Sequence, residues 1–315
     1  MEPGALMRAA REAAGISLRA MAERSYYSRA YLSLIETGQR PVPAGVVAAY
    51  ERVLGADLER LTAVARAPAS VDPVALSDVA VMLAATRRIE DAAGALTVLP
   101  AVRGMAEMAE AFAGEARAGR SDAACLASEI TQYRGWLEHA IGADSAARRS
   151  LGTAASLAKE SRDPDRIAHS LGFLGYVTVS AGNYDEVLAL SDAALAVRDA
   201  HPVITAYGRM RRAELLAAHG ETRQARRALA LADAAAEAAD GIEAPASMYW
   251  WSTGFGAVQR GGVLALLGYT GEAIEEATHG LAAMPAEHRR SEWLASALRR
   301  VDPDMSAGDS VASQT

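Results

Sequence analysis

The chain has 315 residues and a formal net charge of −7, and 51% of its residues are hydrophobic while only 5% are aromatic. This length suffices for about two domains with sizeable cores, and the acidic balance argues against a protein that coats nucleic acid along its whole surface. Alanine supplies much of the apolar content and is the best helix former, so the composition predicts an all-α chain.

Several classes of protein are excluded by what the sequence lacks. The single cysteine, Cys125, rules out a disulfide framework and a cysteine-based zinc site, and the six histidines show no metal-ligand spacing. No serine-nucleophile, phosphate-loop or dinucleotide-binding motif is present. Neither a signal peptide nor an apolar stretch of about 20 residues is found. We therefore expect a cytoplasmic protein that is not an enzyme, with no cofactor, no metal and no membrane contact.

Residues 16–41 predict two short helices separated by a tight turn. Ser17 and Ser28 stand where N-caps are needed, and Gly38 and Pro41 end the second helix. Because both helices are too short to be stable alone, flanking helices must hold them. The predicted helices of this region are 5–14, 18–24, 29–36, 46–54 and 57–66.

This pattern resembles the phage-repressor-like, Xre-type helix-turn-helix DNA-binding domains over residues 5–66. Residues 8–17 match the first helix of that family, and residues 28–41 match its recognition helix and the following loop. The resemblance implies that the recognition helix enters the major groove of double-stranded DNA with its N-terminal side chains on base edges. The DNA-binding residues that it implies are Ser28, Arg29, Ala30, Tyr31, Ser33, Gln39 and Arg40, with Gln39 and Arg40 on the DNA backbone.

Two positions depart from the pattern of this family. Leu18 replaces the usual glutamine, so one hydrogen bond to a phosphate is missing, and Tyr26 replaces the usual glycine of the turn. A bulky residue with a positive φ costs about 1 kcal/mol or more, so the turn is either strained or rebuilt. These departures leave open a domain that keeps the fold and has lost DNA binding.

The chain divides by charge and by composition. Residues 1–66 hold nine arginines against seven acidic residues, whereas the remainder holds 23 basic against 32 acidic residues. A weakly basic head on an acidic body suits a protein that touches DNA at one end. Residues 67–73 contain two prolines and form the predicted linker, residues 74–301 form a helical repeat domain, and residues 302–315 form a tail predicted to be disordered.

Residues 74–120 predict two helices with a break near Gly94–Pro100, and a repeat follows them. Each repeat unit has a small residue in its first helix, a turn glycine seven positions later, and small residues five and then seven positions further on. This pattern resembles a tetratricopeptide-like α-solenoid, with turn glycines 40, 38 and 48 residues apart. The four units are Gly135, Gly142, Ala147 and Ala154; Gly175, Gly182, Val187 and Ala194; Ala213, Gly220, Ala225 and Ala232; and Gly261, Gly268, Ala273 and Gly280.

Stacked helix pairs curve, and their first helices line a concave surface on which ligands bind. Six of the 17 aromatic residues fall on that predicted groove, which favours a ligand site. Arg211 could meet a carboxylate, although Glu214 one turn later could neutralise it. The predicted ligand-binding residues are Gln132, Tyr133, Trp136, His139, His169, Phe173, Tyr176, Tyr207, Met210, Arg211, Glu214, Phe255 and Gln259.

A helix-turn-helix head on a tetratricopeptide-like body resembles the peptide-sensing transcriptional regulators of Gram-positive bacteria. It equally resembles regulators of the same build whose ligands are unassigned. The resemblance implies a homodimer on a two-fold-symmetric DNA site, controlled by a peptide or small-molecule effector. Two alternatives remain at this point: an interaction adaptor with a degenerate helix-turn-helix, and a biosynthetic enzyme or substrate-binding protein with its pocket in the repeat groove.

Overall fold

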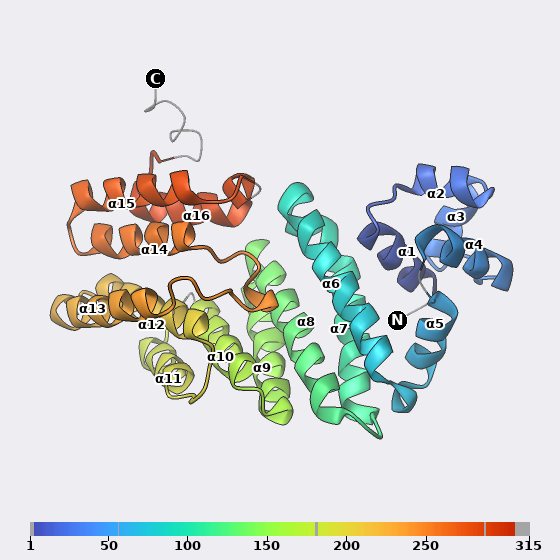
Figure 1. Ribbon diagram of the computed structural model, residues 1–315, viewed down its shortest axis with the longest axis horizontal. Coiled ribbons are helices and arrows are strands. Elements are labelled where there is room, and N and C mark those ends of the chain that lie inside the picture. Colours follow the sequence, from blue (N-terminus) through green and yellow to red (C-terminus); the bar gives the residue numbers. More distant parts are fainter. Residues whose placement is uncertain (1–2, 56, 180–181, 287, 306–315) are drawn as a thin grey trace. The chain divides into compact units, whose positions relative to one another are not determined.

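The structure is a computed structural model that describes residues 3–55, 57–179, 182–286 and 288–305 (Figure 1). Sixteen α-helices and no strand occur among these residues, which confirms the prediction of an all-α chain. No helix in the described ranges is long and apolar enough to cross a membrane. Most of the predicted tail, 302–315, lies outside the described residues.

The chain divides into two compact units, Met1–Arg166 and Ile167–Thr315. Unit 1 begins with five short helices around Leu32 and Ile35, both fully buried. Each predicted helix of the head is confirmed to within about two residues at its ends. The five are α1 (Pro3–Ala13), α2 (Leu18–Ser25), α3 (Arg29–Glu36), α4 (Ala44–Leu54) and α5 (Leu58–Arg66).

Both predicted serine caps are present. The Ser17 hydroxyl oxygen accepts a hydrogen bond from the Ala20 backbone N–H at 3.1 Å, and that of Ser28 accepts one from Tyr31 at 3.2 Å. Each cap satisfies one of the first backbone N–H groups of its helix, which have no partner within the helix. The caps therefore define where α2 and α3 begin, and with them the length of the turn between.

Unit 1 continues without a break in its core from the head into the first long helices. A 3₁₀ turn, Pro68–Ser70, leads into α6 (Pro73–Ala93), and α1 packs against α6. One cluster of buried apolar side chains runs from Leu6 to Leu137. The structure thus divides the chain after Arg166, whereas a domain boundary at residues 67–73 stays a prediction.

The next helix, α7 (Ala95–Glu115), follows α6 directly. Gly94, with a φ of 78°, ends α6, but Pro100 lies inside α7. The predicted break near Gly94–Pro100 is therefore confined to Gly94. A proline removes one backbone hydrogen bond, and the turns around Pro100 are held by Leu99 and Val102, which are buried.

The repeat helices form the predicted antiparallel pairs (Figure 1). The pair in unit 1 is α8 (Arg120–Ala140) and α9 (Asp144–Ser161), joined at Gly142, whose φ is 79°. A Cβ at Gly135 would lie 3.2 Å from the Ala147 carbonyl oxygen, so the two helices are close because the residue is glycine. The predicted role of small residues at this seam is confirmed.

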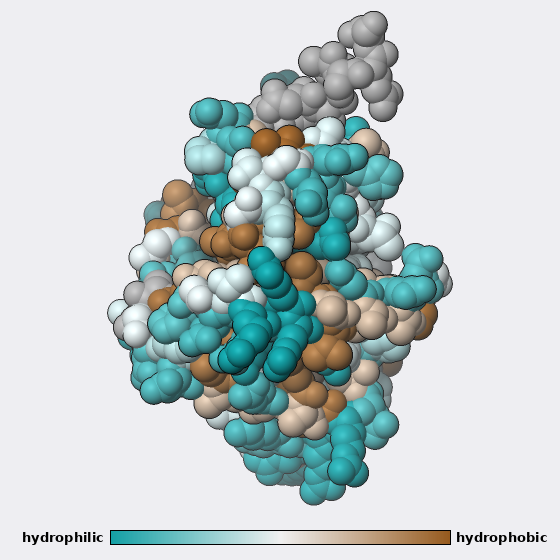
Figure 2. Space-filling model, turned by 90° about the vertical axis from the view of Figure 1, so that its left-hand side faces the viewer, coloured by the Kyte–Doolittle hydropathy of each residue, from teal (hydrophilic) through white to brown (hydrophobic). Residues whose placement is uncertain are grey.

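Unit 2 repeats the same arrangement around turn glycines with positive φ, at positions 182, 220 and 268. A last helix, α16, packs against α14 and buries Leu294 and Leu298. On the face in Figure 2, apolar side chains emerge in small patches between polar ones. The helices from residue 164 onward are α10 (Pro164–Thr178), α11 (Tyr184–Leu195), α12 (Pro202–Ala218), α13 (Thr222–Ala238), α14 (Thr253–Leu266), α15 (Thr270–Ala283) and α16 (Glu292–Val301).

Candidate nucleic-acid interface and ligand pocket

α3, its N-cap and the loop after it present the predicted DNA-binding residues on the surface. Leu32 and Ile35 bury the opposite side of the helix, which fixes the direction of this face. Of the predicted residues, Ser28, Arg29, Ala30, Gln39 and Arg40 are exposed, and Tyr31 and Ser33 are half-buried. All seven therefore remain accessible, at the N-cap of α3, on α3 itself or in the loop that follows it.

Tyr31 is held in place on this surface by its neighbours. Its ring stacks on Tyr27 with centroids 5.7 Å apart, and the Arg40 guanidinium lies 5.7 Å from the Tyr31 centroid. Arg29 makes no hydrogen bond or ion pair with any described residue and is fully available to a partner. The surface thus combines a rigid aromatic side chain with a free guanidinium group, which suits contacts with DNA bases and phosphates.

The turn before α3 takes the strained form of the two alternatives that the sequence leaves open. Tyr26 has φ 62° and ψ 21°, in the left-handed region, and 90% of the residue is exposed. For a residue with a Cβ this backbone conformation costs about 1 kcal/mol or more. The turn keeps the geometry that glycine would give it, at a cost in stability.

The predicted groove residues of unit 1 are largely packed inside it. Gln132 and Tyr133 are buried, and the Tyr133 hydroxyl donates to Glu90 Oε2 at 3.3 Å. Trp136 and His139 are half-buried, with ring centroids 6.1 Å apart, and His139 Nδ1 lies 2.7 Å from an Asp144 carboxylate oxygen. The structure therefore gives these four residues partners in unit 1.

A buried polar group lies next to them. The Glu129 carboxylate meets Arg87 Nη1 at 2.8 Å and Arg166 Nη1 at 3.5 Å. Burial opposes the ionisation of Glu129, but the two guanidinium groups outweigh it and lower the pKa of this carboxyl. Burial, with the nearby Asp163 carboxylate, raises the pKa of Cys125 to about 12, so this thiol stays protonated at neutral pH.

An aromatic cluster fills the interior of unit 2. The ring centroids of Phe173 and Tyr207 lie 6.3 Å apart, and Trp250 lies 5.1 Å from Tyr207 and 5.6 Å from Phe255. His169 joins the cluster through Phe173, at 4.9 Å. Met210 and Gln259, also predicted groove residues, are buried. Most predicted ligand-binding residues of this unit thus contribute to its packing.

Trp250 and Trp251 belong to this cluster and were not singled out as site residues by the sequence analysis. They follow a 3₁₀ turn, Ala246–Met248, in the long connection before α14, and Met248 is fully buried. Two adjacent tryptophans after an irregular loop were the available signal. Tryptophan rings stabilise a protein when they are buried, so two of them in one loop indicate a segment that packs against the interior.

Four predicted residues do come together at a pocket between α10, α11 and α12. Tyr176, Tyr207, Arg211 and Glu214 line it. Three glycines leave space in its walls, and aliphatic side chains complete them. These other lining residues include Gly172, Gly175, Gly208, Val187, Leu195 and Leu215.

The charged side chains that line the pocket are Arg211 and Glu214, and Arg300 of α16 reaches Glu214 without lining the pocket itself. The Arg211 guanidinium lies 4.2 Å from the Tyr176 ring centroid and pairs with Glu214, which also meets Arg300 Nε at 3.3 Å. Burial opposes the charge on Arg211, but Glu214 and the nearby tyrosines outweigh it and raise the pKa of Arg211. Burial raises the pKa of Tyr207 to about 12, so its hydroxyl remains a donor at neutral pH. One carboxylate thus serves two guanidinium groups.

Comparisons with known proteins agree with the geometry of the head. The sequence of residues 3–64 matches a protein family described as a helix-turn-helix domain. Residues 3–64 are a helix-turn-helix domain.

No curated protein matches the chain. Among solved structures, Bacillus thuringiensis PlcR in complex with the peptide PapR7 and DNA is similar at 14% identity and a TM-score of 0.43, over 89% of this chain and 92% of that one. These values are too low to transfer its ligands.

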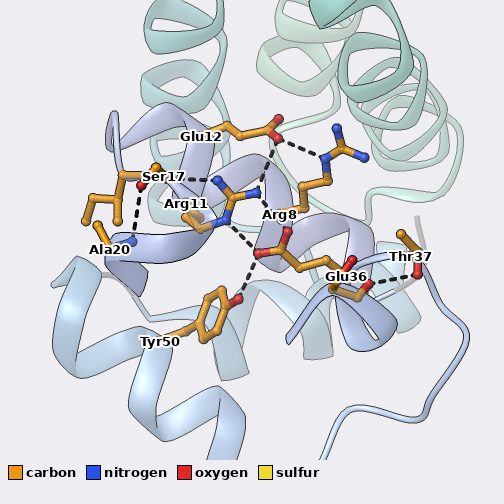
Figure 3. A network of polar contacts seen from close by, with 10 residues as sticks. Arg8, Arg11, Glu12, Ser17, Ala20, Glu36, Thr37 and Tyr50 are labelled. Atoms are coloured by element: carbon orange, nitrogen blue, oxygen red, sulfur yellow. Dashed lines mark hydrogen bonds and ion pairs between the residues drawn. The ribbon is translucent and has the colours of Figure 1, made fainter. Parts of the chain in front are cut away.

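The helix-turn-helix domain is held together by a buried ion pair that the sequence analysis missed (Figure 3). Arg11 in α1 donates through Nε and Nη2 to the two Glu36 carboxylate oxygens at 2.7 and 2.8 Å. The Tyr50 hydroxyl of α4 donates to Glu36 at 2.7 Å, and Arg11 Nη1 also donates to the Ile16 carbonyl oxygen at 2.8 Å. The one available signal was that Glu36 lies one turn after Leu32, on the buried face of α3.

Burial and the Glu36 carboxylate together raise the pKa of the Tyr50 phenol, which therefore keeps its proton and acts only as a donor to Glu36. Burial opposes the charge on Arg11, but Glu36 outweighs it and raises the pKa of this guanidinium. At neutral pH Arg11 therefore stays charged and Tyr50 stays protonated, so both act as donors. The network joins α1, α3 and α4 and sets how the domain presents the exposed face of α3.

Proposed function

We propose that this chain is a sequence-specific, DNA-binding transcriptional regulator. The observation that supports this most directly is the exposed N-terminal part of α3, with an unpaired Arg29 and a Tyr31 held between Tyr27 and Arg40. A recognition helix presented in this way can enter the major groove. In this proposal residues 1–66 form the DNA-binding domain and residues 74–301 form the effector-binding domain. Residues 67–73 are the linker between these two domains.

The proposed protein acts in the cytoplasm as a homodimer and performs no catalysis. A dimer would place two heads on half-sites one helical turn, about 34 Å, or a multiple of it apart. An effector would act through its preference for one arrangement of the dimer. The competing adaptor and enzyme roles predict that changes on the exposed face of α3 leave the activity of the protein intact.

Replacing Arg29 with alanine is expected to weaken binding to the preferred DNA site by about 5- to 100-fold, the range for loss of one good base contact. The preferred site is first obtained by selection from random duplexes with the wild-type protein, and affinity is then measured at one fixed salt concentration. Arg88→Ala is the matched control, because Arg88 is exposed on α6 and its loss changes the net charge equally. Equal binding by the two variants, or no sequence preference in the selection, would overturn the proposal.

For the effector we propose an apolar molecule that carries a carboxylate, bound in the pocket between α10, α11 and α12. The pocket is lined by aliphatic side chains and by the rings of Tyr176 and Tyr207, which suits the apolar part of a ligand. Arg211 is the guanidinium group that lines the pocket, and it shares its partner Glu214 with Arg300, so Arg211 is the group that would meet a ligand carboxylate. The C-terminus of an apolar peptide and a small organic acid share this chemistry.

Replacing Arg211 with alanine is expected to weaken binding of such a ligand at least tenfold, since a charge-assisted hydrogen bond is lost. Arg212→Ala is the matched control, because Arg212 pairs with Asp192 and does not line the pocket. The probes are apolar peptides with free or amidated C-termini and small aliphatic or aromatic acids, measured by calorimetry. A free carboxylate should bind and its amide should not; equal binding of acid and amide would refute the ligand class.

A further inference from the structure

Tyr26 has an unfavourable conformation and an unfavourable environment at once. Among the described residues only Tyr26, Arg162 and Asp199 combine a side chain with a positive φ. Asp tolerates this region because its short side chain bonds locally, whereas a tyrosine gains nothing from it. With 90% of the residue exposed, no packing within the chain offsets the cost. Strain of this kind is often retained where the residue has a function.

The neighbouring tyrosine shows that the turn could have buried an aromatic ring. Tyr27 is half-buried, stacks on Tyr31, and approaches Gly45 so closely that a Cβ there would lie 3.3 Å from the Tyr27 hydroxyl. The turn therefore packs one tyrosine against the domain and holds the next one out in solvent. Tyr26 lies two residues before the cap of α3, at the end of that helix which carries Arg29.

The surroundings of Tyr26 favour a polyanion as its partner. Arg24 and Arg29 are both exposed, and neither forms an ion pair with a described residue. Within the described part of the helix-turn-helix domain, Tyr26 is the one exposed large hydrophobic side chain, so no apolar patch exists there for a protein to cover. Phosphate oxygens accept hydrogen bonds from tyrosine hydroxyls as well as from arginine.

We propose that Tyr26 is a DNA-contacting residue whose hydroxyl donates to a backbone phosphate beside the half-site read by α3. The inference rests on the proposed function. When the N-terminal end of α3 enters the major groove, the turn before it comes close to the groove edge, where the phosphates lie. A contact of this type positions the protein and carries no sequence information. The strained turn is thus the means by which the hydroxyl reaches the DNA.

The test compares Tyr26→Phe, Tyr26→Gly and Arg29→Ala on the preferred DNA site and on a scrambled duplex. Tyr26→Phe removes only the hydroxyl, and we expect about tenfold weaker binding to both duplexes, by the same factor. Tyr26→Gly removes the strain as well, so its melting temperature should be no lower than that of the wild type while its DNA affinity falls equally. This opposite response of stability and affinity separates a DNA contact from a structural role.

The outcomes distinguish this inference from the proposed function. If Arg29→Ala weakens binding and Tyr26→Phe does not, the Tyr26 contact is refuted and the regulator stands. If Tyr26→Phe weakens binding to the preferred site alone, Tyr26 reads a base and the phosphate assignment is wrong. If Tyr26→Phe binds DNA as the wild type does, while Arg29→Ala does not, and transcription by purified RNA polymerase is lost with Tyr26→Phe, the partner of Tyr26 is a protein and the DNA contact is refuted. If neither variant affects DNA binding, both proposals fall.

Discussion

Replacing Glu36 with alanine lowers the free energy of unfolding of the helix-turn-helix domain by about 3–5 kcal/mol, the expected cost of removing one partner of a buried ion pair. Arg11 would then keep a buried positive charge with only the Glu12 carboxylate, 3.3 Å from its Nη2, as an ion-pair partner among the described residues, and the Tyr50 hydroxyl would lose its acceptor. Both penalties act in the interior between α1, α3 and α4. This is the largest effect that we expect from a single substitution in the head.

The measurement is hydrogen exchange of backbone amides in α1, α3 and α4, because the chain contains two compact units and need not unfold in one step. Glu23→Ala is the matched control, since Glu23 pairs with Arg19 at 3.0 Å while both side chains are more than 60% exposed. An exposed pair of this kind contributes about 0.5 kcal/mol or less. Equal exchange in the two variants would show that the Arg11–Glu36 pair does not stabilise the domain.

The variant Arg11→Ala, Glu36→Ala gives a second check on the mechanism. If most of the loss of unfolding free energy in Glu36→Ala comes from the buried Arg11 guanidinium without its Glu36 partner, removing Arg11 as well should restore part of the stability. The two losses would then not add. Additive losses would mean that each side chain acts through its own packing rather than through their mutual contact.

The helix-turn-helix domain could be predicted because its signals are local. Ser17 and Ser28 define the starts of α2 and α3 by hydrogen bonds that span three residues, and Gly38 follows the end of α3 with a φ of 72°. Such signals are readable in a single sequence. For Tyr26 the resemblance marks the position where glycine is usual, but the sequence leaves open whether the turn is strained or rebuilt, and the φ of 62° decides it.

The ion pair of the head could not be predicted, because its members are far apart in the sequence. Arg11 and Glu36 are separated by 25 residues, and Tyr50 follows Glu36 by 14. No periodicity relates the three positions. Glu36 on a buried face indicates that some partner must exist, but which of the nine arginines in residues 1–66 supplies it depends on the packing of α1 across α3.

The surroundings of the predicted groove residues could be predicted only in part, for a similar reason. Counting back along a helix from its turn glycine gives the face that a residue occupies, but not what covers that face. Phe173 and Phe255 lie on the expected helices, yet Trp250 from a distant loop packs against both. Tyr176 and Arg211 remained at a pocket because glycines at 172, 175 and 208 leave space in its walls.

Replacing Gly280 with alanine is expected to destabilise unit 2, although the same change normally stabilises a helix. A Cβ at Gly280 would lie 2.5 Å from the Gly254 carbonyl oxygen and 2.9 Å from the Ala257 Cβ, and a Cβ at Gly254 would meet the Gly280 carbonyl at 2.5 Å. The helices α14 and α15 would have to separate. In an open helix position the substitution adds about 0.5–1 kcal/mol of stability, whereas overpacking costs about 1–3 kcal/mol or more.

Because the clash involves backbone atoms that cannot move aside, the penalty should win, with a net loss of about 2 kcal/mol. For a unit of this size we expect a melting temperature lower by roughly 5 °C, measured by calorimetry of the full chain. Gly271→Ala in the same helix is the matched control, since Gly271 is exposed and a Cβ there meets nothing within 4 Å. It should melt at or slightly above the wild type. If the melting temperature of Gly280→Ala is also equal to or above that of the wild type, the close crossing of α14 and α15 at this glycine pair does not exist in solution.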